Sequence, residues 1–276
     1  MMKYFPVTIM IAILFVSCKT EFEKVRTSND PETTYKAANQ YYESENYLNA
    51  QVLYEIAIPY YRGKEEAEDL YFKFAYTYYH LGDYILASHY FKNFAKSFYA
   101  SPNREEAEFM EAYSKYKLSP NYKLDQSYSG AAIDALQNFI NKYPESEKVA
   151  ECNTLIDDIR AKLELKAFTE AKLYYDLKNY NSAITSAENM LIDFPDTKRG
   201  EEVRFLILQA SYNWAKNSVF EKKEERLKDC IKKHAAFTKK YRASEYKKEA
   251  TKILEDSEKE LKFIENVRLK NAGTEY

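Results

Sequence analysis

The stretch from Ala75 to Phe94, AYTYYHLGDYILASHYFKNF, decides the fold. It contains a tyrosine-rich helical segment, a turn with one glycine, and then a Tyr-x-x-Ala motif that ends at Ala87. Phe91 and Phe94 follow this alanine by four and seven residues, which places them on the same face of a helix. Small residues such as Ala75 and Ala87 let two helices approach closely. The stretch therefore predicts two short helices packed against each other.

The same pattern recurs along the chain. The counterparts of Ala87 are Ala50, Ala132 and Ala183, and successive alanines are 37, 45 and 51 residues apart. Core residues follow at four and seven positions after each alanine: Tyr54 and Ala57, Phe91 and Phe94, Leu136 and Phe139, Ala187 and Met190. In three copies a pair precedes the alanine by twelve and nine residues: Ala38 and Tyr41, Ala75 and Tyr78, Ala171 and Tyr174. This is the tetratricopeptide pattern, with a period of about 34 residues, so the wider spacings indicate insertions.

A degenerate fifth copy and a last amphipathic helix complete the array. The fifth copy has Ala210 and Tyr212 in its first helix, and Cys230 replaces the alanine in its second. Residues 244–267 keep one stripe of core residues: Tyr246, Ala250, Ile253, Ser257, Leu261 and Ile264. We therefore predict an all-α fold, a tetratricopeptide-repeat superhelix of about five helix pairs over residues 32–267 with a C-terminal capping helix. Residues 268–276 are expected to be a disordered tail.

Composition agrees with an all-α domain and lowers the expectation for several function classes. The 276 residues are 45% hydrophobic and 30% charged, and only 5 are glycine and 7 proline, beside 27 tyrosines and 16 phenylalanines. A mean hydropathy of −0.64 is too polar for a polytopic membrane protein. Forty-one basic against 43 acidic side chains offer no large positive field for nucleic acid.

The N-terminus has the features of a lipoprotein signal peptide. Lys3 precedes an apolar run over residues 7–16, too short to cross a bilayer, which ends in Ser17 and Cys18. This ending is similar to a bacterial lipobox, although Phe15 stands where leucine is usual. The similarity implies that residues 1–17 are removed and that Cys18 is acylated; several acyl chains on one residue give stable anchoring. Residues 18–31 are then a lipidated, flexible tether, and an ordinary signal peptide is the alternative.

No constellation of catalytic or metal-binding residues is apparent. His80, His89 and His234 are scattered, and no cysteine or histidine pair has the spacing of a metal site. There is neither a glycine-rich phosphate loop nor a nucleophile elbow. We therefore expect no cofactor, no metal and no enzyme activity. Cys152 and Cys230 both fall in predicted helices, where buried thiols are favoured and a disulfide is the alternative.

Binding is what a helical repeat array offers. In such an array the first helix of each repeat lines the concave groove. Counting from Ala38 and Ala75 gives an aromatic groove in the first two repeats, suited to an extended or hairpin peptide: Tyr35, Tyr42, Phe72, Tyr76, Tyr79 and His80. Counting from Ala171 gives Phe168, Lys172 and Tyr175 as candidates for contacting a partner protein. The alternative is that these rings pack between adjacent repeats.

With the repeats and the lipobox placed, the chain resembles the BamD family, the tetratricopeptide lipoproteins of the outer-membrane barrel-assembly (Bam) machinery. Residues 101–110 and 119–126 resemble the middle repeat and insertion loop of the family. Residues 131–146 resemble the next helix and its exit, and residues 171–175 and 194–197 resemble the fourth repeat. The resemblance covers about residues 32–265 and is closest to the Bacteroidetes branch.

The resemblance implies an outer-membrane scaffold that faces the periplasm. N-terminal repeats of the family bind unfolded outer-membrane proteins, and C-terminal repeats hold BamA, the barrel insertase. Ser186 stands where enterobacterial relatives carry an arginine that touches BamA, so that contact is not carried over. Two alternatives share the fold. One is a periplasmic adaptor of envelope or division machinery, which the insertion at residues 119–128 disfavours. The other is a glycan-binding lipoprotein of the SusD type, whose chains are much longer.

Overall fold

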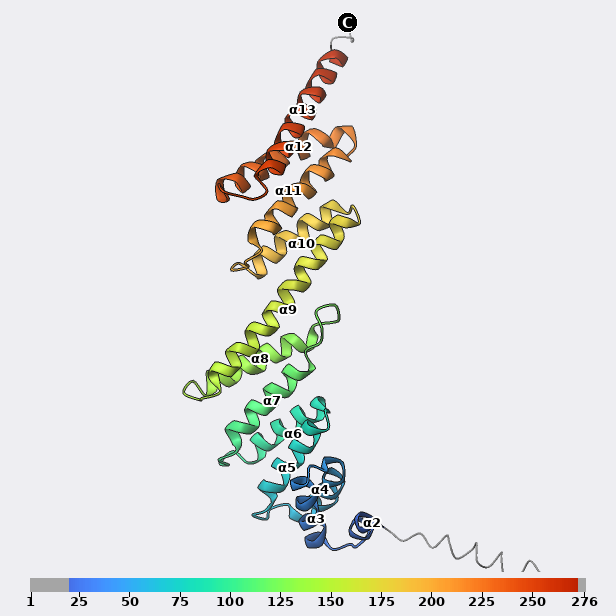
Figure 1. Cartoon of the computed structure of the whole chain (residues 1–276), viewed down its shortest axis with the longest axis vertical. Helices are drawn as coiled ribbons and strands as arrows, with labels where there is room; N and C mark the ends of the chain where they lie inside the picture. The colour runs from blue at the N-terminus through green and yellow to red at the C-terminus, as the bar shows by residue number, and fades with distance from the viewer. Residues whose placement is uncertain (1–19, 273–276) are drawn as a thin grey trace, which may run out of the picture. The chain divides into compact units, whose positions relative to one another are not determined.

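The computed structural model describes residues 20–272, and this part of the chain contains twelve helices and no strand. The helices are α2 (Glu21–Arg26), α3 (Pro31–Glu43), α4 (Tyr47–Tyr61), α5 (Ala67–His80), α6 (Tyr84–Ser97), α7 (Arg104–Leu118), α8 (Ser127–Lys142), α9 (Val149–Asp176), α10 (Tyr180–Asp193), α11 (Gly200–Lys216), α12 (Phe220–Lys240) and α13 (Lys247–Ala272). Figure 1 shows consecutive helices running back and forth, as paired repeats do. The prediction of five helix pairs followed by a last helix is confirmed, with α3/α4 as the first pair and α11/α12 as the fifth. We call the first helix of each pair an A helix and the second a B helix.

The chain divides into two compact units. Unit 1 comprises residues 1–120 and 125–159, and unit 2 comprises residues 121–124 and 160–276. Unit 1 holds the pairs α3/α4, α5/α6 and α7/α8, and unit 2 holds the pair α11/α12 and α13. Helix α9 begins in the first unit and ends in the second.

The predicted repeat positions form the core of both units. The alanines at the helix crossings, together with Cys230, have no exposed surface: Ala38, Ala50, Ala75, Ala87, Ala132, Ala171 and Ala183. The large residues that follow them are buried as well, including Tyr54, Phe91 and Leu136. A methyl group at the crossing leaves room for a neighbouring ring, and this alternation of small and large residues fills the space between the helices.

The turn from an A helix to its B helix repeats one local design. In the second pair, Gly82 has a φ of 79°, a left-handed conformation that costs glycine little. The next residue, Asp83, caps α6 because its carboxylate accepts a hydrogen bond from the backbone N–H of Leu86 at 3.1 Å. Glu45 and Lys178 take the left-handed position in the first and fourth pairs.

A second design recurs in three of the connections from a B helix to the next A helix. The hydroxyls of Ser101, Ser146 and Thr197 each donate to a glutamate of the preceding A helix, at 2.5 to 2.6 Å. Each hydroxyl also accepts a hydrogen bond from the backbone N–H two residues later, which closes a tight turn. These three hydroxyls belong to the segments on which the family resemblance was based.

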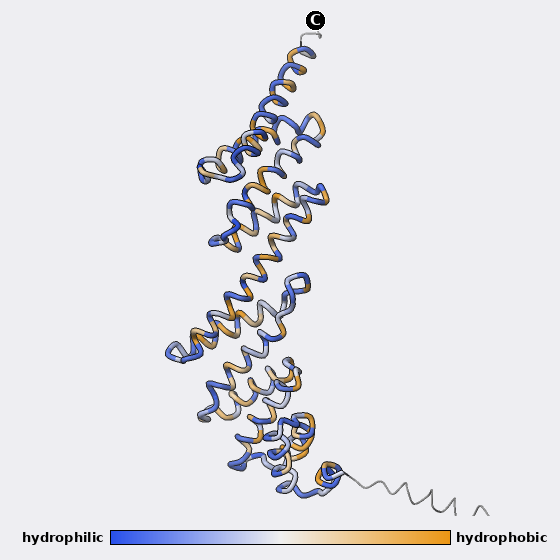
Figure 2. The backbone as a smooth tube through the Cα atoms, in the orientation of Figure 1, coloured by the Kyte–Doolittle hydropathy of each residue, from blue (hydrophilic) through white to orange (hydrophobic). Residues whose placement is uncertain are grey.

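The wide repeat spacings have two structural causes. Helices α7 and α8 are joined by residues 119–126, a connection longer than the three-residue turns of the first two pairs. Helix α9 is 28 residues long, about twice the length of α3 or α5. No described helix is both long and apolar enough to span a bilayer, and Figure 2 shows hydrophobic and hydrophilic residues alternating along the helices.

Two expectations about the chain ends need correction. Part of the expected flexible tether is helical: Thr20 caps α2, Glu23 pairs with Arg26, and the ring of Phe22 lies 5.9 Å from that of Tyr41 in α3. The expected disordered tail is helical to Ala272, because residues 268–272 contain no glycine or proline to end the helix. Cys18 and the signal peptide lie outside the described residues, so their assignment stays a prediction.

Cys152 and Cys230 are free and buried, in agreement with the favoured interpretation. Burial raises the pKa of both thiols to about 11, so they are protonated at neutral pH. The thiols therefore act as small core side chains.

Candidate protein-interaction surface

The six predicted groove residues lie on α3 and α5, and the rings of four of them, Tyr42, Tyr76, Tyr79 and His80, contact one another. The ring of Tyr42 lies 6.4 Å from that of His80, and the ring of Tyr76 lies 5.9 Å from the same histidine. Tyr79 lies 5.6 Å from His80. The structure thus brings the aromatic side chains of the first two repeats together, as the repeat register predicts.

Two of the four tyrosines among these six residues also join neighbouring repeats. The hydroxyl of Tyr35 donates to Asp69 at 2.7 Å, and the hydroxyl of Tyr76 donates to Glu106 at 2.9 Å. Burial, with the neighbouring Asp69, raises the pKa of Tyr35 to about 12. The ring of Tyr35 packs 4.8 Å from that of Tyr61. For Tyr35 and Tyr76 the alternative interpretation, packing between repeats, therefore describes their main contacts.

Phe72 is also engaged in packing. Its ring lies 5.0 Å from Phe94 and 5.1 Å from Tyr76, and the side chain is half-buried. Tyr42 and Tyr79 are half-buried too, and His80 is the one exposed residue among the six. The surface open to a ligand in these two repeats is therefore centred on His80 and on the edges of the surrounding tyrosine rings.

Three rings that the groove prediction missed complete this surface. Tyr47 stacks on His80 with ring centroids 4.1 Å apart and an interplanar angle of 8°. Tyr84 and Tyr113 lie 5.6 and 6.1 Å from Tyr79. Tyr47 and Tyr84 are the tyrosines of the Tyr-x-x-Ala motif, so the motif itself was the signal. Where the motif is present, it places a ring at the start of the B helix, beside the end of the A helix.

We define the aromatic cluster as Tyr42, Tyr47, Tyr76, Tyr79, His80, Tyr84 and Tyr113. The ammonium group of Lys117 lies 5.8 Å from the ring of Tyr84 and 6.0 Å from that of Tyr113, within cation–π range. Neighbouring rings partly exclude water from the imidazole of His80, which lowers its pKa below 6.5 and favours the neutral form at pH 7. The rings themselves carry no charge, so they favour contact with apolar and aromatic side chains.

The three residues predicted to contact a partner lie on one face of α9 in unit 2. Phe168 and Tyr175 are half-buried and pack against the core formed with α10 and α11. The guanidinium of Arg199 lies 4.8 Å from the ring of Phe168, and Asn213 donates to the hydroxyl of Tyr175 at 3.0 Å. Lys172 is exposed, so it is the member of the three that is most available to a partner.

A polar depression of about 390 Å³ lies between α9 and α10. Its α10 lining is made of hydroxyl and amide side chains: Asn181, Ser182, Thr185, Ser186 and Asn189. Glu170 and Asp193 line the same depression, so Ser186 is part of a hydrogen-bonding surface that also carries two acidic side chains. A partner that docks here meets neutral donors and acceptors together with negative charge.

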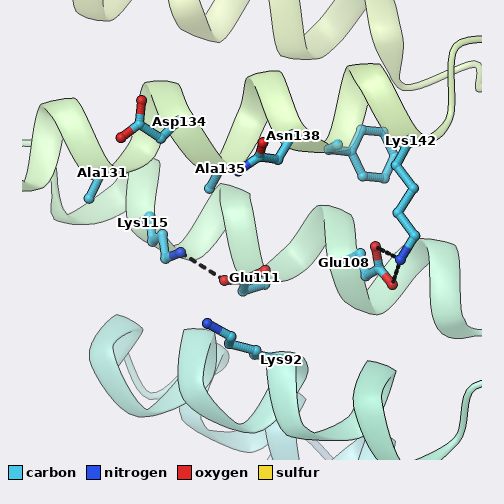
Figure 3. Close-up of a pocket in the computed structure, with 10 residues that line it drawn as sticks. Lys92, Glu108, Glu111, Lys115, Ala131, Asp134, Ala135, Asn138 and Lys142 are labelled. Carbon is cyan, nitrogen blue, oxygen red and sulfur yellow. Dashed lines mark hydrogen bonds and ion pairs between the residues drawn. The ribbon is translucent and has the colours of Figure 1, made fainter.

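A second depression, of about 370 Å³, lies in unit 1 among α6, α7 and α8. Lys115 pairs with Glu111 at 2.7 Å and Lys142 with Glu108 at 2.5 Å, while Lys92 points from α6 toward α7 (Figure 3). These charges compensate one another across the helices. In the part of the chain that the structure describes, no group of three or more histidine, cysteine, aspartate or glutamate side chains could hold a metal ion.

Comparison with known proteins connects this architecture with envelope proteins. A family model described as YfiO, outer membrane lipoprotein, matches residues 27–223. Outer membrane protein assembly factor BamD of Helicobacter pylori is 36% identical over 64 residues, a stretch that covers 23% of this chain and 29% of that relative. The aligned part is thus under a third of the relative's length.

Among solved structures, TPR-like repeats of a Podosopora anserina kinesin light chain match 80% of this chain and 99% of their own, with 13% identity and a TM-score of 0.31. This TM-score is too low to support a fold assignment. The assignment is therefore based on the helices of this chain alone.

Proposed function

The chain belongs to the YfiO family of outer membrane lipoproteins, and from this membership we propose that it is a non-enzymatic scaffold in the assembly of outer membrane proteins. The observation that carries the proposal is the extent of the family match. Residues 27–223 include every helix from α3 to α11, so the resemblance lies in the repeats and not in a shared anchor.

The scaffold is proposed to hold two kinds of partner. Unit 1 takes unfolded outer membrane proteins, because its aromatic cluster offers large ring surfaces to their apolar and aromatic side chains. Unit 2 contacts a BamA-type insertase through the exposed Lys172 and the hydroxyl and amide side chains around Ser186. The mature chain is held at the outer membrane through acylated Cys18 and faces the periplasm.

Affinity purification of the tagged, acylated protein from detergent-solubilised outer membranes tests the scaffold role. A near-stoichiometric BamA-type barrel protein among the captured partners is the expected result, read by mass spectrometry. Capture of division or cell-wall proteins without such a barrel protein would instead support the adaptor alternative.

Variants of unit 2 test where the insertase binds. Lys172→Glu is expected to lower the captured barrel protein, because it reverses the charge of an exposed side chain on the proposed surface. Ile192→Ser is the matched control, since Ile192 is 74% exposed at the far end of α10 and lies outside the lining of the polar depression. Equal loss in both variants would mean that the interface lies elsewhere.

Client binding is tested with a urea-unfolded outer membrane β-barrel protein diluted onto the purified scaffold. Replacing both Tyr42 and His80 by alanine should weaken capture about thirtyfold, since aromatic anchors each contribute on the order of 1 kcal/mol and a factor of ten corresponds to about 1.4 kcal/mol. Tyr99→Ala is the control, because Tyr99 is 74% exposed and does not belong to the aromatic cluster. Unchanged capture in the double variant would contradict the assignment of the client surface to unit 1.

The anchor is tested separately by Cys18→Ala. This variant should leave the membrane fraction, because the acyl chains supply most of the membrane affinity. Sedimentation with outer membranes after a salt wash, in the absence of Cys18, would contradict the anchor assignment.

A further inference from the structure

The exposed aliphatic side chains of unit 1 gather at one edge of its repeats. Leu48 is 60% exposed, Ile85 is 55% exposed, and Leu81 and Leu86 are exposed to a lesser degree. All four lie in the turn from an A helix to its B helix or in the first turn of that B helix. We call these four residues the apolar edge.

The opposite edge of unit 1 has a different composition. The connections from B helices to the next A helices, residues 62–66, 98–103 and 143–148, contain no exposed leucine, isoleucine or valine among the described residues, and the first and third of them contain exposed charged side chains. Tyr99 is the large exposed side chain there. The two edges therefore differ in chemistry, although both are built from helix connections.

Half-buried aromatic rings lie behind the apolar edge. Tyr47 begins α4 one residue before Leu48, and Tyr84 begins α6 one residue before Ile85. Both rings belong to the aromatic cluster, which joins the ends of α3 and α5 to the starts of α4 and α6. Aliphatic tips backed by amphipathic tyrosine rings match the chemistry of a membrane–water interface, where aromatic residues concentrate at headgroup depth.

The chain joins unit 1 at this same edge. Helix α2 packs against α3 and α4, and Phe22, near its first residue, contacts Tyr41, which lies near the last residue of α3. Glu21 and Ser44 line one depression of about 510 Å³ between α2 and α3, and Ser44 begins the turn to α4. The start of α2 therefore lies beside the first turn of the apolar edge.

The distance to the predicted anchor is short. Thr20 lies two positions after Cys18 in the sequence, and two steps of extended chain span at most about 7 Å. An acylated Cys18 holds its acyl chains in the bilayer, so the turn that carries Leu48 is held close to the lipid headgroups. A tether this short gives the apolar edge a high effective concentration at the bilayer surface, which lets a small apolar surface remain docked there.

We propose that the apolar edge of unit 1 docks on the phospholipid bilayer to which the chain is tethered. The proposal rests on the lipid anchor in the proposed function. Leu48, Leu81, Ile85 and Leu86 enter the headgroup region, and the tyrosine rings behind them lie at the level of the interface. Glu45 and Asp83 lie in the same turns, so the docking is apolar and does not depend on anionic lipid.

Depth-dependent fluorescence quenching tests the docking. The full-length, acylated protein carrying Ile85→Trp is reconstituted in vesicles of phosphatidylethanolamine and phosphatidylglycerol, with or without brominated acyl chains. Tyr99→Trp is the matched control, because residues 85 and 99 are both well exposed and lie at opposite edges of unit 1. Unsubstituted protein supplies the signal of Trp214, the one tryptophan of the chain, for subtraction.

Docking is expected to quench the emission of the Ile85→Trp variant in brominated vesicles and to shift it to shorter wavelength, with no quenching of the Tyr99→Trp variant. Equal emission of the two variants on vesicles that both proteins bind would overturn the proposal. The proposal would also fail if the emission of the Ile85→Trp variant shifted to shorter wavelength only after an unfolded client is added. The apolar edge would then be a protein-binding surface.

The experiment distinguishes failure of the membrane docking from failure of the lipid anchor and from failure of the scaffold role. If neither variant sediments with vesicles, the anchor has failed, and the docking fails with it because the tether is its premise. If both variants sediment and still capture a BamA-type barrel protein but the Ile85→Trp variant is not quenched, the docking alone is wrong. A second substitution, Leu48→Trp, should behave like Ile85→Trp, since Leu48 belongs to the neighbouring turn of the same edge.

Discussion

Lys178 occupies a backbone conformation that suits glycine. Its φ is 61°, at the position where the second helix pair has Gly82 with a φ of 79°. A side chain in the left-handed region costs about 1 to 2 kcal/mol, of which glycine recovers only part because it is freer in the unfolded chain. Lys178→Gly should therefore stabilise the protein by about 0.5 to 1 kcal/mol in urea unfolding.

The reciprocal substitution is the control. No heavy atom lies within 4 Å of a Cβ added to Gly82, so Gly82→Ala tests the backbone alone. It should destabilise the protein by about 1 kcal/mol. A loss of stability in both variants would mean that the side chain of Lys178 contributes more than its backbone conformation costs.

His234 makes the stability of unit 2 depend on pH. The side chain is buried in α12, its Nε2 atom has no hydrogen-bond partner among the described residues, and burial lowers its pKa below 6.5. The unfolded chain therefore binds a proton first as pH falls, so stability is complete above pH 6.5 and is lost as pH falls below it toward the folded-state pKa.

Chemical denaturation of the protein at pH 7.5 and pH 5 measures this loss. His234→Gln should flatten the pH dependence, and part of it should remain because burial also lowers the pKa of His80. His89→Gln is the control at an exposed histidine. An unchanged slope in the His234→Gln variant would show that the imidazole is not the titrating group.

At the scale of the helix pair, the small residue at the crossing controls packing. Ala87 has no exposed surface and lies one helical turn before Phe91, which is also fully buried. An indole at this position cannot fit without moving α5 away from α6, so Ala87→Trp should destabilise the protein by about 1 to 3 kcal/mol or more. The thermal unfolding midpoint measures the effect, with Ala150→Trp on an exposed face of α9 as the control. Equal midpoints for the two variants would contradict the repeat register.

The helix pairs also explain how far the sequence could predict the structure. Burial of Ala50, Ala87, Ala132 and Ala183 follows from periodicity, because each position depends only on the neighbouring helix of its own pair. The packing of Tyr35 and Tyr76 between repeats could not be predicted in this way. It depends on Asp69 and Glu106 in the next repeat, which accept their hydrogen bonds.

The candidate surface was predictable to a similar extent. Counting along α3 and α5 found Tyr42 and His80 but missed Tyr47, whose ring reaches His80 from the next helix.

The helix in the expected tether was not predicted, because few apolar residues precede Pro31. A single ring contact from Phe22 and a cap at Thr20 suffice to hold this short helix against α3. Isolated contacts of this kind leave no periodic signal.

At the scale of the whole chain, stability is expected to be local. Substantial contacts between described helices join helices that are adjacent or one helix apart along the sequence, as in α11, α12 and α13. In such an array each repeat is stabilised by its neighbours, so a defect spreads over a short range. A substitution at Leu227 introduces such a packing defect, since Leu227 is fully buried against Ala215 and Ile264 in unit 2.

Leu227→Ala should cost about 2 to 5 kcal/mol through the lost side chain and the cavity that remains. Native-state hydrogen exchange should then show loss of amide protection in α11, α12 and α13, while α3 to α6 keep the protection of the unsubstituted protein. Lys232→Ala, at an exposed position of α12, controls for a change in helix propensity. A uniform loss of protection from α3 to α13 would mean that the chain unfolds as one cooperative body. The aromatic cluster of unit 1 would then lose its ordered rings together with α12, and client capture and insertase binding could no longer be tested by separate substitutions.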